Sequence, residues 1–396
     1  MAGWVFWALV ARHTSTTQVG TATATLGLVS LLALACTLGL PNTFVRFLAR
    51  DPDPRRLLTS GLWATALAGF ATGTIWAAVY PFTPALDTIT SRSVVVFGVV
   101  VSALGMLGTF ALVAQRRAAW VLSKDTAGSV VKLGTVAVLW RFGALGVIAA
   151  TFIGTALGTV VAIGSALRSR YAPAPSRPRA PSSNGNSAPK WYWTRHLRFS
   201  LGNHLSVVVA SLPALVLPAV VATVLGANDA AYVAVALMLL AALNIIPQAL
   251  SNAMLAEIGH DETQVRRHVL RALAAIYAGA VPAALVLYVL APRVLTLFGE
   301  RYSQHATTCL RWMCVATLIS GLNYVGDTVL LAFKRVRAYG VVNIAGTVLV
   351  LASIVVFANN STSGIGLGWL CGQVGYLLIS LLGLWRSGVV ARLLAR

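Results

Sequence analysis

Long apolar runs, separated by short polar segments, alternate along the whole sequence. A helix needs about 20 mostly apolar residues to cross a bilayer, and most of these runs approach that length. Six runs precede a polar stretch near the middle of the chain and six follow it. They lie near residues 2–11, 19–40, 58–80, 94–114, 127–140, 147–167, 202–225, 232–250, 272–292, 309–332, 339–358 and 365–384. The pattern predicts an all-α polytopic membrane protein with about 12 transmembrane helices.

Two of the runs are short for a membrane span. The run at 2–11 is too short to cross alone, so it either enters at an angle or belongs to a longer helix. The run at 127–140 is long enough only if the polar segment before it, "KDTAGSVVK" (124–132), is helical and packs against protein. The length of this fifth helix therefore depends on the structure of its approach.

The polar stretch "RSRYAPAPSRPRAPSSNGNSAPK" (168–190) differs from everything around it. It is rich in Pro, Ser and Arg and contains no Leu, Ile, Val or Phe, a composition typical of a linker. We therefore predict an N-terminal six-helix lobe at 1–167, a cytoplasmic linker at 168–198 and a C-terminal six-helix lobe at 199–396. A regulatory phosphosite or docking segment in "SRPRAPSS" is the alternative interpretation.

The low charge of the chain excludes a large soluble enzyme. Only 10% of its residues are charged, and its mean hydropathy is +0.79, whereas soluble domains carry about 25% charged residues. The net charge of +20 comes from cations in small groups between the apolar runs, which argues against nucleic acid as a partner.

With both termini and the linker in the cytoplasm, most Lys and Arg fall on the cytoplasmic side, as the positive-inside rule requires. We expect a multi-pass protein of the cell membrane in this orientation.

Short matches between the two halves suggest an internal repeat. "LVAQRRAAW" (112–120) follows the fourth run, and "LLAFKRVRAY" (330–339) follows the tenth, which aligns Arg116 with Lys334. "GALGVIAA" opens the sixth run and "GLGWLCG" opens the twelfth at nearly the same offset. The matches predict two parallel repeats, which a cytoplasmic tether could join.

Several segments resemble polysaccharide flippases, the Wzx-like branch of the multidrug/oligosaccharidyl-lipid/polysaccharide exporter superfamily. "VGTATATLGLVSLLALACTLGLPNTFVRFLAR" resembles the second helix and following loop of that family, and "VLTLFGERY" resembles its outer loop before helix ten. "LLAFKRVRAYGVVNIAGTVLVLASIVV" and "GIGLGWLCGQ" resemble its closing helices. The short first run departs from the family pattern, because the family's first helix contributes to the N-terminal lobe and its cavity.

The resemblance implies two pseudo-symmetric six-helix lobes around a central cavity. It also implies translocation of a polyprenyl-diphosphate-linked oligosaccharide across the cell membrane by alternating access, for exported polysaccharide biosynthesis. Membrane lipid would then be a partner of the substrate's tail. A polysaccharide polymerase or glycosyltransferases would be further partners.

No set of residues in the sequence is typical of catalysis. It has no Gly-rich phosphate loop with Lys, no HExxH and no paired carboxylates in a span, and its four cysteines lack metal-ligand spacing. We therefore expect no enzyme activity, cofactor or metal. A multidrug/cation antiporter of the same superfamily is the alternative, but the interiors of the first six runs hold no Asp or Glu. A membrane glycosyltransferase would need catalytic residues in a large outer loop, and the outer loops are short.

Three charged residues in or beside the apolar runs are candidate substrate-binding residues. Lys132 lies in the fifth run, where an uncompensated charge costs roughly 3 kcal/mol; it either faces the cavity and attracts a diphosphate or snorkels to the headgroups. Asp327, in the tenth run, is either a proton or cation site or a carboxylate satisfied by the basic cluster at Lys334. Arg46 continues an apolar helix at the cytoplasmic face, and either captures the diphosphate or acts as a topological charge.

The remaining candidates are an arginine and a set of neutral polar residues. Arg311 lies beside Trp312 near the predicted outer face and is either a substrate contact or an interfacial anchor. Amides and imidazoles suit sugar hydroxyls, but they also form hydrogen bonds between helices without any ligand. A helix bent at Pro247 would suit a moving gate. The candidates of this kind open the seventh run or flank Pro247 in the eighth: Asn203, His204, Asn244 and Gln248.

Overall fold

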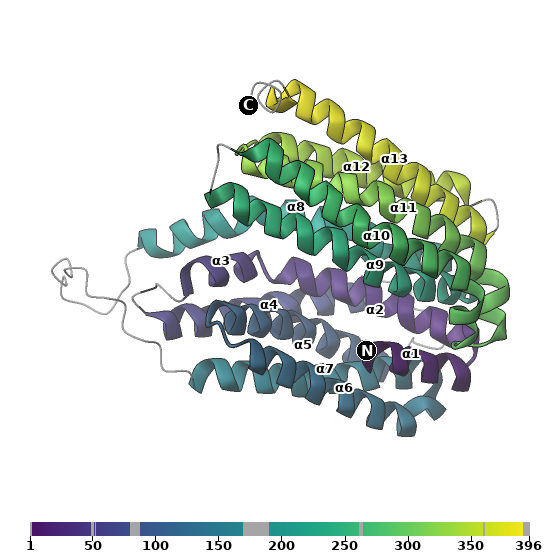
Figure 1. Ribbon diagram of the computed structural model, residues 1–396. Helices are drawn as coiled ribbons and strands as arrows, with labels where there is room; N and C mark the ends of the chain where they lie inside the picture. The colour runs from purple at the N-terminus through teal and green to yellow at the C-terminus, as the bar shows by residue number, and fades with distance from the viewer. Residues whose placement is uncertain are drawn as a thin grey trace, which may run out of the picture. The chain divides into compact units, whose positions relative to one another are not determined.

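The computed structural model describes residues 2–48, 51, 53–79, 88–168, 190–260, 264–358 and 361–390. Every regular element within these residues is helical (Figure 1). The helices are α1 (Ala2–His13), α2 (Thr16–Cys36), α3 (Leu40–Phe47), α4 (Pro54–Val79), α5 (Ile89–Ala114), α6 (Ala118–Leu139), the 3-10 helix η3 (Trp140–Phe142), α7 (Gly143–Arg168), α8 (Lys190–Val224), α9 (Ala227–His260), α10 (Val265–Thr296), α11 (Glu300–Ala332), α12 (Val336–Phe357) and α13 (Thr362–Arg386).

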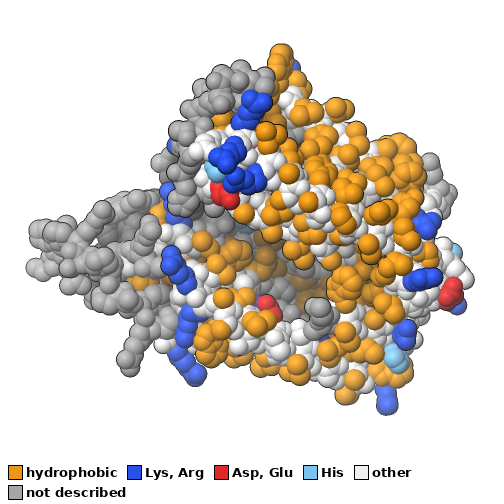
Figure 2. Space-filling model, viewed as in Figure 1, with side chains coloured by type: hydrophobic (Ala, Val, Ile, Leu, Met, Phe, Trp, Pro, Cys, Tyr) orange, Lys and Arg blue, Asp and Glu red, His pale blue; other side chains and the backbone are white. Residues whose placement is uncertain are grey.

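Each of the twelve apolar runs lies mainly on one of these helices, although the run at 19–40 also covers the turn after α2 and the first residue of α3. Ten helical stretches of the described residues are long and apolar enough to cross a membrane, and one of them, Ala118–Arg168, comprises α6, η3 and α7. The helix α1 has 12 residues and is not among these stretches, as the short first run predicts. Figure 2 shows hydrophobic side chains over most of the helix surfaces in view, with charged side chains gathered near helix ends. These features identify a multi-pass membrane protein.

The polar segment before the fifth run is helical and packs against protein, as the length of that span requires. The helix α6 begins at Ala118 and has 22 residues, so the segment 124–132 is helical. It also packs against protein, because the side chain of Lys124 is only 12% exposed. This polar approach therefore gives α6 the length of a membrane span.

The end of α2 corrects the prediction that Arg46 continues an apolar helix. Leu38 and Gly39 adopt positive φ angles of 51° and 72°, a left-handed conformation that ends a helix. Pro41 then stands in the first turn of α3, where its missing N–H costs no hydrogen bond. Arg46 therefore belongs to a separate helix of eight residues.

The chain forms two compact units, which are described separately. The first comprises Met1–Phe6 and Thr25–Val208, and the second comprises Trp7–Ala24 and Val209–Arg396. These bounds differ from the predicted lobes, because Trp7–Ala24 joins the later part of the chain and the start of α8 joins the earlier part. The end of the predicted linker, 190–198, is also helical, as part of α8. Most of that linker lies outside the described residues, and the lobe boundaries stay a prediction.

Apolar side chains from α3, α4, α5 and α7 form one core of the first unit. Leu40, Phe44, Leu57, Leu107 and Ala162 are buried together there. The first part of α8 is held in the same unit by polar contacts with the end of α2. His204 lies with a ring nitrogen 2.9 Å from the carbonyl oxygen of Ala35, and the Ser200 hydroxyl donates to the Leu38 carbonyl.

The second unit includes the connection between α1 and α2. Arg12 donates a hydrogen bond of 2.9 Å from Nε to the Leu297 carbonyl. Thr16 and Thr17 both donate to Oδ1 of Asn228, at 2.6 and 2.9 Å. The start of α2 is therefore anchored to the start of α9.

Two turns at repeat-related positions have the same backbone conformation. Arg116, between α5 and α6, has φ 56°, and Lys334, between α11 and α12, has φ 59°. In each turn the following N–H bonds back to a carbonyl five residues earlier, Arg117 to Leu112 and Arg335 to Leu330. Such left-handed helix ends usually employ glycine. The shared turn supports the internal repeat.

Candidate functional site

The lysines of α6 lie where two helices approach unusually closely. A Cβ atom placed on Gly154 of α7 would lie 2.5 Å from the Gly128 carbonyl oxygen and 2.7 Å from Cβ of Lys132. A Cβ on Gly158 would lie 3.2 Å from the carbonyl oxygen of Lys124. Glycine at 154 is therefore needed for the backbones to meet. The contact fixes the stretch of α6 that carries both lysines against α7.

The ammonium group of Lys132 rests on an aromatic ring of α1. Its Nζ lies 3.8 Å from the centroid of the Phe6 ring, and Phe6 is 0% exposed. A cation over a ring face is attracted by the ring's quadrupole, more strongly where water is excluded. Neither sequence interpretation of Lys132 included this partner, because nothing in the apolar run at 2–11 marks Phe6 as different from its neighbours.

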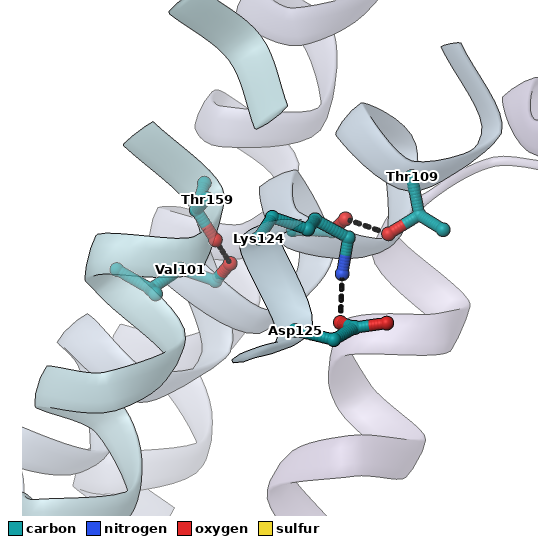
Figure 3. Close-up of polar contacts among 6 residues, drawn as sticks. Val101, Thr109, Lys124, Asp125 and Thr159 are labelled. Carbon is teal, nitrogen blue, oxygen red and sulfur yellow. Dashed lines mark hydrogen bonds and ion pairs between the residues drawn. The ribbon is translucent and has the colours of Figure 1, made fainter. Parts of the chain in front are cut away.

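A second lysine, Lys124, lies two turns earlier on α6 and pairs with the next residue. Its Nζ donates to Oδ1 of Asp125 (Figure 3). Two threonine hydroxyls in the same close-up donate elsewhere: Thr109 to the Gly105 carbonyl at 2.8 Å and Thr159 to the Val101 carbonyl at 3.2 Å. Sequence reasoning counted Lys124 only as a cytoplasmic charge. The burial of its side chain makes it a candidate of the same kind as Lys132.

In the second unit, Asp327 of α11 accepts two side-chain hydrogen bonds. Oδ2 accepts from the Tyr376 hydroxyl at 2.8 Å, and Oδ1 accepts from Nδ2 of Asn343 at 3.3 Å. The expectation that the basic cluster at Lys334 satisfies this carboxylate was therefore wrong. The partners come instead from α13 and α12. Asp327 thus joins three helices of the unit.

A glycine positions the tyrosine of this cluster. A Cβ atom on Gly346 of α12 would lie 1.6 Å from Cδ2 of Tyr376, so the ring of Tyr376 lies directly against the α12 backbone. A larger residue at 346 would displace the ring and, with it, the hydroxyl that reaches Asp327.

An amide cluster lies one to two turns from Asp327 on the same helix. Asn323 donates from Nδ2 to Oε1 of Gln373 at 2.9 Å, and the Ser320 hydroxyl donates to the same oxygen at 3.1 Å. Sequence reasoning missed these residues. A signal was present, because Ser320, Asn323 and Asp327 follow the i, i+3, i+7 spacing of one helix face, but the apolar character of the run concealed it.

The two other candidate arginines contact aromatic rings. Arg46 is exposed, and its guanidinium lies 5.4 Å from the centroid of the Phe47 ring. Arg311 lies 5.2 Å from the Tyr288 ring centroid and donates from Nε to the Tyr288 carbonyl at 3.3 Å. The contact between Arg311 and Tyr288 links α11 to α10, which suits an anchoring role.

The neutral candidates have different surroundings. His204 contacts the Ala35 carbonyl, as described above, which suits a hydrogen bond between helices. The side chain of Asn203 lies outside the described residues. Oδ1 of Asn244 is buried and accepts no hydrogen bond from the described part of the chain, so the expected inter-helical bond is absent at this atom. Gln248 is exposed, one residue after the buried Pro247.

The candidate residues are divided between the two units. Lys132, Arg46, Asn203 and His204 belong to the first unit, whereas Arg311, Asn244, Gln248 and Asp327 belong to the second. Among the described residues, no group of three or more His, Cys, Asp or Glu could hold a metal ion. The best-defined polar features are the lysine pair of α6 in the first unit and the Asp327 cluster in the second.

Comparisons with known proteins give structural relatives. No protein-family model and no curated protein matches the sequence. The structure resembles an inward-facing multidrug resistance MATE family transporter of the MOP superfamily, with a TM-score of 0.76 and 16% identity, over 99% of this chain and 95% of that one. It resembles the lipid II flippase MurJ in an inward closed conformation, with a TM-score of 0.76 and 14% identity, over 97% and 85%.

A third similar structure is a MOP superfamily transporter from Pyrococcus furiosus, described as having a binding pocket of reverse polarity that suggests a different function. Its TM-score is 0.63 and its identity 16%, over 99% of this chain and 95% of that one. At such identities the likeness concerns the fold. The chain therefore has the fold of the MOP superfamily transporters.

Proposed function

We propose that the chain is a transporter that moves a polyprenyl-diphosphate-linked oligosaccharide across the cell membrane by alternating access, for the biosynthesis of an exported polysaccharide. The fold supports a transporter, and one structure that shares it is a lipid II flippase. The resemblance of the sequence to polysaccharide flippases supports the class of substrate. The head group of such a substrate is a dianion, and the lipid tail would stay among membrane lipids.

The observation that carries the proposal is the pair of lysines on α6. Lys124 and Lys132 lie on α6, a helix of 22 residues within the apolar helical stretch Ala118–Arg168. A cation within such a segment is costly unless it meets water, a partner or an anion. Two cations on one helix, with a single carboxylate beside them, favour an anionic ligand over a cationic one.

A multidrug/cation antiporter is the second candidate function, and three observations favour it. Asp125 lies within α6, although the sequence placed no acid inside the first six runs. Asp327 is held by Tyr376 and Asn343 in a segment that can cross a membrane, where a proton or cation site could lie. MATE transporters are also among the similar structures. In α6, however, Lys124 neutralises Asp125, which weakens this alternative for the first unit.

Reconstituted protein can test the two functions against each other. The probe for flipping is a fluorescent short-chain polyprenyl-diphosphate disaccharide placed in both leaflets of a proteoliposome, with a membrane-impermeant quencher outside. We expect quenching of the inner-leaflet probe to depend on the protein and to be lost in Lys124→Gln/Lys132→Gln. Uptake of ethidium driven by a proton or sodium gradient, without movement of the lipid probe, would overturn the proposal in favour of the antiporter.

Partners are part of the same proposal. Glycosyltransferases would assemble the lipid-linked oligosaccharide on the cytoplasmic side, and a polymerase would consume it after transport. Deleting the gene should then cause a lipid-linked glycan to accumulate facing the cytoplasm, which mass spectrometry of the lipid extract would identify.

A further inference from the structure

The contact between Lys124 and Asp125 does not fit a stabilising pair within a helix. Residues at i and i+1 point about 100° apart on a helix and do not face each other, so helix-stabilising pairs use i+3 or i+4 spacing. Lys124 reaches Asp125 only by folding its side chain back over the helix surface. The pair therefore adds little to the stability of α6.

The two partners differ strongly in exposure. The side chain of Lys124 is 12% exposed, whereas that of Asp125 is 60% exposed. An ammonium group can donate three hydrogen bonds, and Asp125 is the acceptor that the described part of the chain offers it. The nearby hydroxyls of Thr109 and Thr159 donate to backbone carbonyls instead. Lys124 is thus a largely buried cation with spare donors and a partner that can swing away.

The position of Lys124 relates it to Lys132. Eight residues of α-helix separate the two, which corresponds to about 12 Å along the axis. Both belong to the stretch of α6 that Gly154 and Gly158 of α7 hold in place. The two lysines therefore offer two positions along α6 at which a diphosphate could bind.

We propose that Lys124 forms a second anion subsite on α6, where Asp125 occupies the ammonium group until the phosphates of the substrate replace it. This inference rests on the proposed function. It adds Lys124 as a binding residue and Asp125 as a group that competes with the substrate for Lys124. Asp125 neutralises the cation in the absence of substrate and lowers the affinity for weaker anions. A diphosphate displaces Asp125 because it offers more charge and more acceptors than one carboxylate.

Purified protein and farnesyl diphosphate as the probe provide the test, with binding measured by calorimetry. Asp125→Asn should bind farnesyl diphosphate several-fold more tightly than the parent. Lys124→Gln should bind it about ten-fold more weakly, the effect of losing one charge-assisted contact. Lys124→Arg should stay within a few-fold of the parent. Arg141→Gln, which removes an exposed cation of η3, is the control and should leave binding unchanged.

The double variant Lys124→Gln/Asp125→Asn distinguishes competition for Lys124 from a general effect on binding of removing a negative charge. If Asp125 competes for Lys124, the gain from Asp125→Asn disappears when Lys124 is absent. A gain that persists in the double variant, or an Asp125→Asn protein that binds no more tightly, overturns the subsite. If the parent protein binds farnesyl diphosphate in that case, only the subsite at Lys124 is excluded, and the proposed function stands. A parent protein that binds farnesyl diphosphate no better than farnesol overturns both.

Discussion

The ammonium group of Lys132 lies 3.8 Å from the centre of the Phe6 ring, so a cation of α6 is covered by a buried side chain of α1. This contact offers Lys132 a partner that is neither substrate nor lipid headgroup. It ties the first residues of the chain to the first unit. It also means that a diphosphate approaching Lys132 meets a cation that is already shielded on one side.

The contact should contribute measurably to stability. Phe6→Leu keeps an apolar side chain but removes the ring, and cation–π pairs contribute about 0.5–2 kcal/mol. We expect a lower midpoint of thermal unfolding in detergent. We also expect the effects of Phe6→Leu and Lys132→Met to be less than additive in the double variant. Strictly additive effects would show that the two side chains do not interact.

Transport should depend on the charge of Lys132. Under the proposed function, Lys132→Ala loses a charge-assisted contact and should reduce flipping about ten-fold or more. Lys132→Arg keeps the charge and should retain much of the activity. The proteoliposome assay with the fluorescent lipid probe measures both. Failure of both variants together with an active Lys132→Gln would instead indicate a need for a hydrogen-bond donor of that size.

Asp327 should matter for folding. Asp327→Ala removes the acceptor of the Tyr376 hydroxyl and one of the two acceptors of the Asn343 amide, which also donates to the Tyr339 carbonyl. A donor left unpaired in a buried site costs about 1–3 kcal/mol. Asp327→Asn retains a carbonyl oxygen and should cost less. Thermal unfolding of the purified variants tests this order. An Asp327→Ala protein as stable as the parent would exclude a structural role for the carboxylate.

Gly346 should tolerate no side chain. Gly346→Ala would place Cβ within 1.6 Å of the Tyr376 ring, and overpacking of this kind typically costs about 1–3 kcal/mol. Gly164→Ala in α7 is a matched control, because a Cβ there meets no atom within 4 Å. We expect a lower unfolding midpoint for the first variant and an unchanged or higher one for the control. Equal midpoints would mean that Tyr376 is free to move aside.

Cysteine labelling can test the predicted orientation of the chain in the membrane. Cys36, Cys309 and Cys314 are buried and Cys371 is half-buried, so the parent protein is labelled beside the variant to measure the background from native thiols. Ser183→Cys in the predicted linker should react with an impermeant maleimide only after the cells are permeabilised. Labelling in intact cells would place the linker outside and reverse the predicted topology.

Hydropathy predicted the helices well because a membrane requires each span to be long and apolar. The twelve runs, the short first helix and the dependence of α6 on its polar approach could all be read from spacing. Hydropathy does not show the break at Leu38 and Gly39, because the run is apolar on both sides of it. The Gly and Pro of "GLP" are the signal for a helix end that the hydropathy pattern left unused. Arg46 was therefore assigned to the wrong helix.

The candidate sites were less predictable than the helices. Lys132 and Asp327 stand out as charges among apolar residues, and the structure gives both of them specific partners. The partners themselves, Phe6 and Tyr376, look like ordinary aromatic residues of a span. Their roles arise from contacts between helices that are distant in sequence, which the order of residues in one helix does not encode.

The glycine contact between α6 and α7 also limits how the molecule can move. The backbones of α6 and α7 meet at Gly128 and Gly154 with no side chain between them, so we expect the two helices to move together during transport. The spacing between Lys124 and Lys132 then stays the same at every stage of a transport cycle. A substrate that passes from one lysine to the other would therefore have to cover the same distance along α6 in every transport cycle.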